Sequence, residues 1–263
     1  SLVVRGPAAG IALYGKPMLR PFSDLDVLVP RDAVDAALQA VRELGYTPRT
    51  EGFSVRYFRR HHLHVPLFFP DRRVRLELHW ALDHPYTLYT IDYPALFAGA
   101  DTCEYQGVGF PVLSMPHRLL TMGLHLAKHA PFLAQWLKED DLANLLFESR
   151  LFIWLTDMAW FVEREGVEVD WDALRSLAAA WGVHGELATC LAAARRVYGV
   201  SVPGAQEAAA DGGPPPGGRL RRRAARAELQ RLRAGHSGSA AWQRVMRGAV
   251  FRPVRALDLA SFL

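Results

Sequence analysis

Asp24 and Asp26 stand two residues apart, directly before the apolar run 27–29, which ends at Pro30. Side chains alternate between the two faces of a β-strand, so we expect both carboxylates on one face. Neighbouring carboxylates repel each other, and a divalent cation relieves that repulsion. Mg²⁺ binds carboxylate oxygens together with substrate phosphates. The pair therefore indicates a Mg²⁺ (or Mn²⁺) site for a phosphate-bearing substrate, although two acids in a turn would look the same.

A third acid, Glu77, lies in segment 73–80, where apolar and polar residues alternate. Such alternation is typical of a half-buried strand, and it places Glu77 and His79 on the polar face. If this strand lies beside the strand of Asp24, three carboxylates gather there and suit one or two metal ions. The alternative is an edge strand with a solvated charged face.

Two further positions are candidates for phosphate contact. Gly6 joins a short apolar run to an expected helix, and such a junction lets backbone N–H groups and the helix N-terminus approach an anion. Arg5 stands next to it. Arg20 lies four residues before Asp24 and could pair with a phosphate or lie on the surface.

The elements that position these residues predict an α+β fold with two domains. Strands are expected at 2–5, 25–29, 54–59, 63–69 and 73–80, with a strand pair near 101–113 and helices at 7–15 and 31–44. The segments 54–59 and 63–69 are predicted to pair antiparallel. Helices are expected at 116–130, 133–147, 150–165, 171–181, 184–199, 219–233 and 239–249. We therefore predict a mixed-sheet catalytic domain (1–115) and an all-helical domain (116–263) with a mobile Gly/Pro linker at about 203–218.

Composition narrows the class of protein. Half of the 263 residues are hydrophobic, which is enough for a sizeable core. No apolar stretch reaches membrane-spanning length and no signal peptide is visible, so no membrane partner is expected. Two cysteines, Cys103 and Cys190, fit a reducing cytoplasm and predict no disulfide. The net charge is +4, and much of the excess lies in 219–233, which reads as a solvated helix or as an RNA contact.

Several ordered segments carry a family resemblance. They are Val3–Gly6, Ala12–Tyr14, Leu19–Val29, Leu44–Tyr46, Leu76–Trp80, Trp154–Asp157, Asp170–Leu174 and Trp181–Gly182. Together they resemble a family of uncharacterised bacterial nucleotidyltransferases in the DNA polymerase β-like superfamily, over about residues 2–203. Two departures stand out: Gly6-Pro7 replaces the usual Gly-Ser or Gly-Gly, and Arg5 replaces a lysine. The chain also begins at the first strand, where relatives carry an N-terminal extension.

The resemblance implies a polymerase β-like palm and assigns roles to the acids. Asp24 and Asp26 would hold metal ions that bridge the triphosphate of an NTP, with ATP as the default. Glu77 would complete the second metal site and help to deprotonate the acceptor hydroxyl. Gly6, Arg5 and Arg20 would contact the nucleotide, and His79 would orient Glu77 or bind the acceptor, unless it makes only a structural hydrogen bond.

The resemblance also draws in residues of the helical half. His125 and His129 stand at i, i+4 in helix 116–130, and they would line the site, as would Lys128, which would reach phosphate. A zinc ion on the two histidines has no evident third ligand. Asp157 lies in an apolar helix and needs a partner, either His129 or Lys128 across a helix pair or the acceptor site.

Three functions remain open from the sequence. The first is transfer of NMP from an NTP to a hydroxyl of a small molecule, peptide or protein. The second is a toxin-like enzyme that modifies tRNA, which the basic segment 219–233 favours. The third is a catalytically silent nucleotide-binding or scaffold module, which Gly6-Pro7 favours. The acceptor is not specified by any motif.

Overall fold

The computed structural model describes residues 1–69, 75–84, 87, 89–138, 151–166 and 168–202. These residues divide into two compact units, and the chain passes from the first to the second between Ser114 and Met115.

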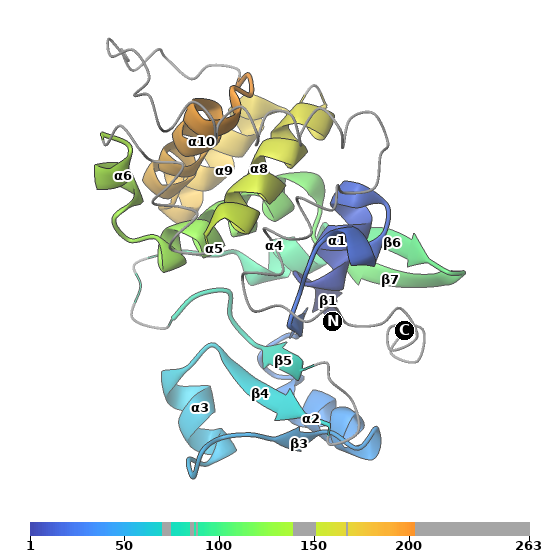
Figure 1. Ribbon diagram of the computed structural model, residues 1–263. Helices are drawn as coiled ribbons and strands as arrows, with labels where there is room; N and C mark the ends of the chain where they lie inside the picture. Colours follow the sequence, from blue (N-terminus) through green and yellow to red (C-terminus); the bar gives the residue numbers. More distant parts are fainter. Residues whose placement is uncertain (70–74, 85–86, 88, 139–150, 167, 203–263) are drawn as a thin grey trace. The chain divides into compact units, whose positions relative to one another are not determined.

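Within the described residues, the first unit is built on a seven-stranded sheet in the order β3-β4-β5-β2-β1-β7-β6 (Figure 1). The strands are β1 (Leu2–Val3), β2 (Asp24–Leu28), β3 (Thr47–Pro48), β4 (His64–Phe68), β5 (Arg75–His79), β6 (Asp101–Tyr105) and β7 (Val108–Val112). The pairs β2–β5 and β1–β7 are parallel, and the others are antiparallel. The α+β class with a mixed sheet is therefore confirmed.

The core of this unit joins the apolar face of the central strands to helices. Leu25 of β2 and Leu76 and Leu78 of β5 belong to one buried cluster with Ile11 of α1 (Pro7–Tyr14) and Leu38 of α2 (Val34–Glu43). Burial of each such side chain stabilises the fold by about 1.5–3 kcal/mol. Since strand residues alternate, the polar residues between these leucines are turned to the opposite face of the sheet.

The predicted strand at 54–59 is wrong. Residues Val55–His61 form helix α3 instead, and the Ser54 side chain accepts a hydrogen bond from the backbone N–H of Tyr57 at its start (3.1 Å). Val55 and Phe58 pack against the core at a spacing of three residues, which is a helical and not a strand period. Ser54 is therefore an N-cap. Segment 54–59 was expected to pair with β4, but the strands that pair with β4 are β3 and β5.

Other elements of the first unit follow local signals. The strand pair predicted near 101–113 is confirmed as β6 and β7, joined by a turn with positive φ at Gln106 (53°) and Gly107 (80°). Helix α4 (Tyr93–Ala98) was not predicted, and Asp92 caps it by accepting from the N–H of Ala95 (2.9 Å). A 3₁₀ turn, η1 (Pro17–Leu19), leads toward β2.

The described elements of the second unit are helices. They are α5 (Met115–His129), α6 (Leu133–Trp136), α8 (Phe152–Glu165), α9 (Trp171–Trp181) and α10 (His184–Tyr198). Four of the predicted helices are confirmed to within two residues. Helix α6 ends at Trp136, and residues 139–147 of its predicted range lie outside the described residues. So do the predicted linker, 219–233 and 239–249. No helix in the described part of the chain is long and apolar enough to cross a membrane.

Candidate active site

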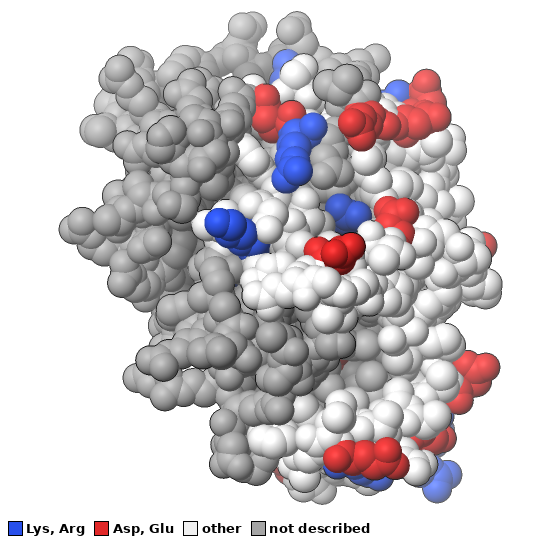
Figure 2. Space-filling model, turned by 90° about the vertical axis from the view of Figure 1, so that its right-hand side faces the viewer, with Lys and Arg blue, Asp and Glu red and all other residues white. Residues whose placement is uncertain are grey.

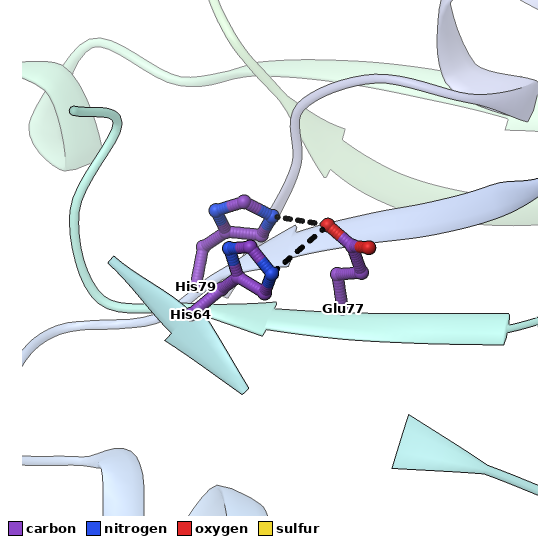
Figure 3. Close-up of side chains that lie close together, drawn as sticks. All are labelled: His64, Glu77 and His79. Carbon is purple, nitrogen blue, oxygen red and sulfur yellow. Dashed lines mark ion pairs between the residues drawn. The ribbon is translucent and has the colours of Figure 1, made fainter. Parts of the chain in front are cut away.

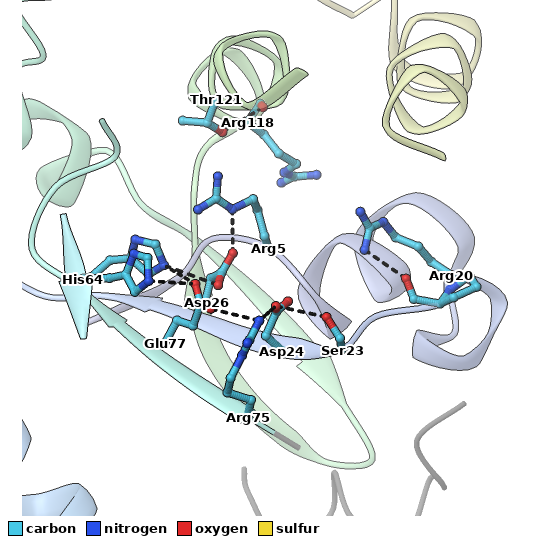
Figure 4. Close-up of polar contacts among 12 residues, drawn as sticks. Arg5, Arg20, Ser23, Asp24, Asp26, His64, Arg75, Glu77, Arg118 and Thr121 are labelled. Atoms are coloured by element: carbon cyan, nitrogen blue, oxygen red, sulfur yellow. Dashed lines mark hydrogen bonds and ion pairs between the residues drawn. The ribbon is translucent and has the colours of Figure 1, made fainter. Parts of the chain in front are cut away.

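The register of two parallel strands brings the predicted acids together. Asp24 of β2 lies opposite Arg75 of β5, and Asp26 lies opposite Glu77. Their side chains project from the face of the sheet opposite to the apolar core (Figure 4). The expectation that the Glu77 strand lies beside the Asp24 strand is therefore confirmed.

Asp26 is the most buried of the three acids, with a relative exposure of 5%. Its Oδ2 accepts from Nε of Arg5 at 2.6 Å, and its Oδ1 lies 3.3 Å from Nε2 of His79. Burial alone would raise the pKa of Asp26. The Arg5 guanidinium and the His79 imidazole outweigh burial and hold this pKa well below its usual range. Asp26 is therefore ionised at neutral pH.

Asp24 lies nearer the solvent and has a different balance of charges. Its Oδ2 accepts from Nη2 of Arg75 at 2.9 Å and from the hydroxyl of Ser23 at 3.0 Å. Burial and the neighbouring Asp26 carboxylate raise the pKa of Asp24, although Arg75 acts to lower it. Its charged form is therefore disfavoured in the folded protein, as expected of one carboxylate beside another.

Glu77 connects the acids to a pair of histidines. Its Oε1 lies 3.1 Å from Nη2 of Arg75, and its Oε2 lies 3.4 Å from Nε2 of His64 and 3.5 Å from Nε2 of His79. Burial would raise the pKa of Glu77, but the hydrogen bond from His79 and the charge of His64 lower it. His79 is 1% exposed. Burial would lower the pKa of His79, but its bonds to Asp26 and Glu77 raise it.

Gly6 has a structural requirement that the sequence did not show. Its φ is 71°, a backbone conformation that residues other than glycine rarely adopt. A Cβ at this position would collide with the backbone carbonyl of Asp24. Gly6 also caps α1, so it sets both the start of that helix and its approach to β2. The glycine thus fixes the position of the strand that carries the two aspartates.

Arg20 is placed differently from the other predicted phosphate contact, Arg5. Its side chain is buried, with 8% exposure, and its Nη1 donates to the carbonyl of Pro21 at 3.4 Å. Figure 4 shows it apart from the three acids. Arg5, in contrast, is in direct contact with Asp26. The structure therefore brings Arg5 to the acids and not Arg20.

The predicted site residues of the second unit lie on two helices. The rings of His125 and His129 on α5 lie 4.6 Å apart, and each lies about as close to the ring of Trp154 on α8. Lys128 is exposed, and Asp157 on α8 is 3% exposed. His125, His129 and Trp154 form a histidine–tryptophan cluster within the second unit. Their participation in catalysis belongs to the proposal below.

Two residues of the site had no role in the sequence prediction. Arg75 stands on the polar face of segment 73–80, so alternation alone could have drawn attention to it. His64 reaches the site because β4 pairs antiparallel with β5, which places it opposite His79. That register is a tertiary feature, and the histidine-rich run 61–64 gives only a compositional signal.

The donor set of the site fits a divalent cation. Asp24, Asp26 and Glu77 supply hard carboxylate oxygens from one sheet face, the ligands that Mg²⁺ and Mn²⁺ prefer. Three carboxylates stand against two guanidiniums, Arg5 and Arg75, which leaves one negative charge when the histidines are neutral. The three acids could therefore hold such an ion if Arg5 and Arg75 turned to other anions.

Comparison with known protein families gives a match. Residues 1–199 match the family described as uncharacterised nucleotidyltransferase, so the match spans the sheet, the three acids and helices α5 to α10. No curated protein and no solved structure matched the chain. The match covers well over half of the 263 residues. The chain therefore belongs to this nucleotidyltransferase family.

Proposed function

We propose that the protein is a Mg²⁺- or Mn²⁺-dependent enzyme that moves NMP from an NTP, ATP by default, to a hydroxyl of a small molecule, peptide or protein. The observation that carries the proposal is the register of β2 and β5, which sets Asp26 opposite Glu77 and Asp24 opposite Arg75. Membership of a nucleotidyltransferase family supports the reaction class. A DNA polymerase β-like architecture and a bacterial, cytoplasmic setting belong to the same proposal.

Asp24, Asp26 and Glu77 would hold the metal. When bound, it would supply positive charge that offsets the negative charge developing on the triphosphate during nucleotidyl transfer. Asp26 suits this role because it stays ionised, and the other two acids flank it on the same face of the sheet. The burial of Asp26 also fixes its carboxylate in place before any ligand arrives.

The two arginines suit the phosphates of the nucleotide. Arg5 and Arg75 each contact one of the carboxylates that would hold the metal, so their guanidiniums lie where they would bind phosphate oxygens of the nucleotide. Arg75 is half-exposed, with 48% of its side chain accessible, and can reach a ligand. Gly6 would serve by holding α1 close to β2, because a side chain at this position would collide with the backbone carbonyl of Asp24.

Glu77 would also help to deprotonate the acceptor hydroxyl, the role that the family resemblance gives to it. Burial would raise the pKa of Glu77, but the hydrogen bond from His79 and the charge of His64 lower it, so this carboxylate is ionised and able to accept a proton. Asp24 and Asp26 keep their roles as metal ligands.

The acceptor side of the proposal involves the second unit. His125, His129, Lys128 and Asp157 would line the acceptor or phosphate site, as the family resemblance suggested. Within the second unit, the rings of His125 and His129 both pack against the ring of Trp154. This side of the proposal rests on the family resemblance.

The tRNA-modifying and silent alternatives have less support. The tRNA alternative depended on 219–233, which lies outside the described residues. On the described part of the face in Figure 2, basic and acidic side chains are interspersed among uncharged ones, whereas nucleic-acid binding favours a basic stripe. The silent alternative depended on Pro7, which stands where a second Gly or Ser is usual, and the three acids retained on the neighbouring strands β2 and β5 argue against it.

A labelling experiment tests the proposal and sorts the acceptors. The protein is incubated with Mg²⁺ or Mn²⁺, a cell extract and ATP labelled on either the α- or the γ-phosphate. We expect the α-label alone to move to an acceptor, and treatment with protease or ribonuclease then assigns its class. Label on RNA would favour the tRNA alternative. Transfer of the γ-label, or no transfer from any NTP, would contradict the proposal.

A further inference from the structure

Three side chains on neighbouring strands converge on one point beside the carboxylate site. Nε2 of His64 on β4 and Nε2 of His79 on β5 both face Oε2 of Glu77, at 3.4 and 3.5 Å (Figure 3). All three ligand atoms lie within 4.8 Å of one another. The two imidazole rings stand 4.7 Å apart at an angle of 35°. Two nitrogen ligands and one oxygen ligand thus share a common focus.

The spacing of these atoms matches the demands of a tetrahedral ion. An ion with bonds of about 2.0–2.1 Å holds its ligand atoms about 3.3–3.4 Å apart. The two distances to Oε2 of Glu77 already lie close to that value. The three ligand atoms all lie within 4.8 Å of one another, and His64 is only half-buried, with 24% of its side chain exposed, so its ring has room to turn.

The ligand types select a class of metal. Imidazole nitrogens suit Zn²⁺ and its neighbours among the transition metals, whereas Mg²⁺ takes oxygen ligands. Two histidines with one carboxylate are a set found in zinc enzymes, with a fourth position left for water or substrate. The ligand types of this group therefore differ from those of Asp24 and Asp26, although Glu77 belongs to both groups and Nε2 of His79 also lies 3.3 Å from Oδ1 of Asp26, a contact that a metal ion on this nitrogen would replace.

The backbone holds the three residues in register. His64 lies directly opposite His79 in the antiparallel pair of β4 and β5, and Glu77 stands two residues before His79 on the same face. Ligands on paired strands keep their spacing better than ligands on loops. His79 is also fixed by burial. The sheet thus presents the ligands without the need for a loop to close.

We propose that His64, Glu77 and His79 bind one divalent transition-metal ion of the zinc class. Glu77 serves both sites because its oxygens point different ways, Oε2 to the histidines and Oε1 to Arg75. An ion on the histidine side would therefore leave Oε1 for the carboxylate side. The proposal depends on this geometry and does not require nucleotidyl transfer.

The test uses the full chain after removal of bound metal, without nucleotide. Co²⁺ is added as a visible substitute for Zn²⁺, and stoichiometry is measured by absorption and by calorimetry. We expect one Co²⁺ with nitrogen ligands, displaced by Zn²⁺ but not by excess Mg²⁺. His64→Ala should weaken Co²⁺ binding by more than about 100-fold. Loss of a residue that only supports a metal ligand already weakens binding by up to about 100-fold, and loss of a ligand itself should cost more. Glu77→Gln provides a second variant with little change in volume.

The controls separate this site from the rest of the protein. His184→Ala removes an exposed histidine at the start of α10 and should leave Co²⁺ binding unchanged. Asp24→Asn should also retain the Co²⁺ spectrum while it abolishes NMP transfer, so the two proposals can fail separately. Thermal unfolding checks that each variant folds. Three results would overturn the proposal. They are absence of Co²⁺ binding in the wild type, Co²⁺ binding by His64→Ala and Glu77→Gln that is as tight as in the wild type, and displacement of Co²⁺ by Mg²⁺.

Discussion

Arg5 donates from Nε to Oδ2 of Asp26 at 2.6 Å, so the most buried acid of the site is paired with a cation from the segment after β1. The two residues are 21 positions apart, and the backbone N–H of Val4 bonds to the carbonyl of Asp26 beside them (3.0 Å). The strand pairing therefore sets the ion pair. The metal proposed at Asp26 would have to compete with this guanidinium.

Arg5→Ala should destabilise the fold and increase its dependence on metal. Removal of one partner from a buried ion pair costs about 3–5 kcal/mol, and we expect the lower end because His79 still contacts Asp26. Mn²⁺ or Mg²⁺ should raise the melting temperature of this variant more than that of the wild type, since bound ligand stabilises by mass action. Arg56→Ala, an exposed arginine on α3, is the matched control. An equal metal response in Arg5→Ala and wild type would contradict a metal at Asp26.

Asp24→Asn should separate stability from activity. Burial and Asp26 disfavour the Asp24 carboxylate, so the amide should leave the free energy of unfolding at pH 7 unchanged or increase it. Because the pKa of Asp24 is raised in the folded protein, the gain in unfolding free energy of Asp24→Asn over the wild type is absent below the unfolded pKa of about 3.9 and grows as pH rises above it. NMP transfer should fall by at least about 100-fold, the scale of a lost electrostatic contact in catalysis, because Asp24 is a proposed metal ligand. Denaturant unfolding measures the stability and a transfer assay on the same preparation measures the activity. A variant that is strongly destabilised but still active would contradict this prediction.

Asp26→Asn should remove a source of acid sensitivity. The pKa of Asp26 is depressed in the fold, so its contribution is present above the unfolded pKa of about 3.9 and is lost as pH falls through the folded pKa. The wild type should therefore be more stable than Asp26→Asn at pH 6, and the difference should shrink as pH falls below about 4. Denaturant unfolding at several pH values measures this difference. A difference that stays constant down to acid pH would show that the ion pair is not the cause.

Gly6→Ala should cost much more than Gly15→Ala. Both glycines have positive φ, 71° and 74°, but a Cβ at Gly15 meets nothing within 4 Å, whereas at Gly6 it collides with Asp24. We expect about 1 kcal/mol for Gly15→Ala from backbone strain alone. Gly6→Ala should exceed about 3 kcal/mol, since overpacking adds to strain. It should also weaken metal binding, because the collision displaces the strand of Asp24. Equal unfolding free energies for the two variants would refute the contact.

The sequence predicted the site better than its surroundings. Alternation alone placed Asp24 with Asp26 and Glu77 with His79, because a strand has a period of two residues whatever its partners are. Alternation within one strand does not show which strand lies beside it or in what register. His64 enters through the register of β4 with β5, and Arg5 reaches Asp26 through the pairing of β1 with β2. Both contacts depend on tertiary structure.

The error at 54–59 has a local origin. The alternation of Val55, Tyr57 and the arginines of this segment also fits a short strand, and a serine before such a segment marks a turn as readily as a helix N-cap. Helix α3 has no buried residue, so packing gave no strong apolar stripe to reveal it. The helices of the second unit were easier, because Leu174, Ala178 and Trp181 recur at helical spacing and are buried.

The most direct test of the proposed reaction is transfer of the α-phosphate label from ATP in the presence and absence of Mg²⁺ or Mn²⁺. The wild type is compared with Asp26→Asn, which keeps nearly the same shape, and with His184→Ala as a folded control. We predict metal-dependent transfer by the wild type and by His184→Ala, and a loss of at least about 100-fold in Asp26→Asn, the scale of a lost electrostatic contact in catalysis. Undiminished transfer by folded Asp26→Asn, or transfer that persists after complete metal removal, would contradict the account.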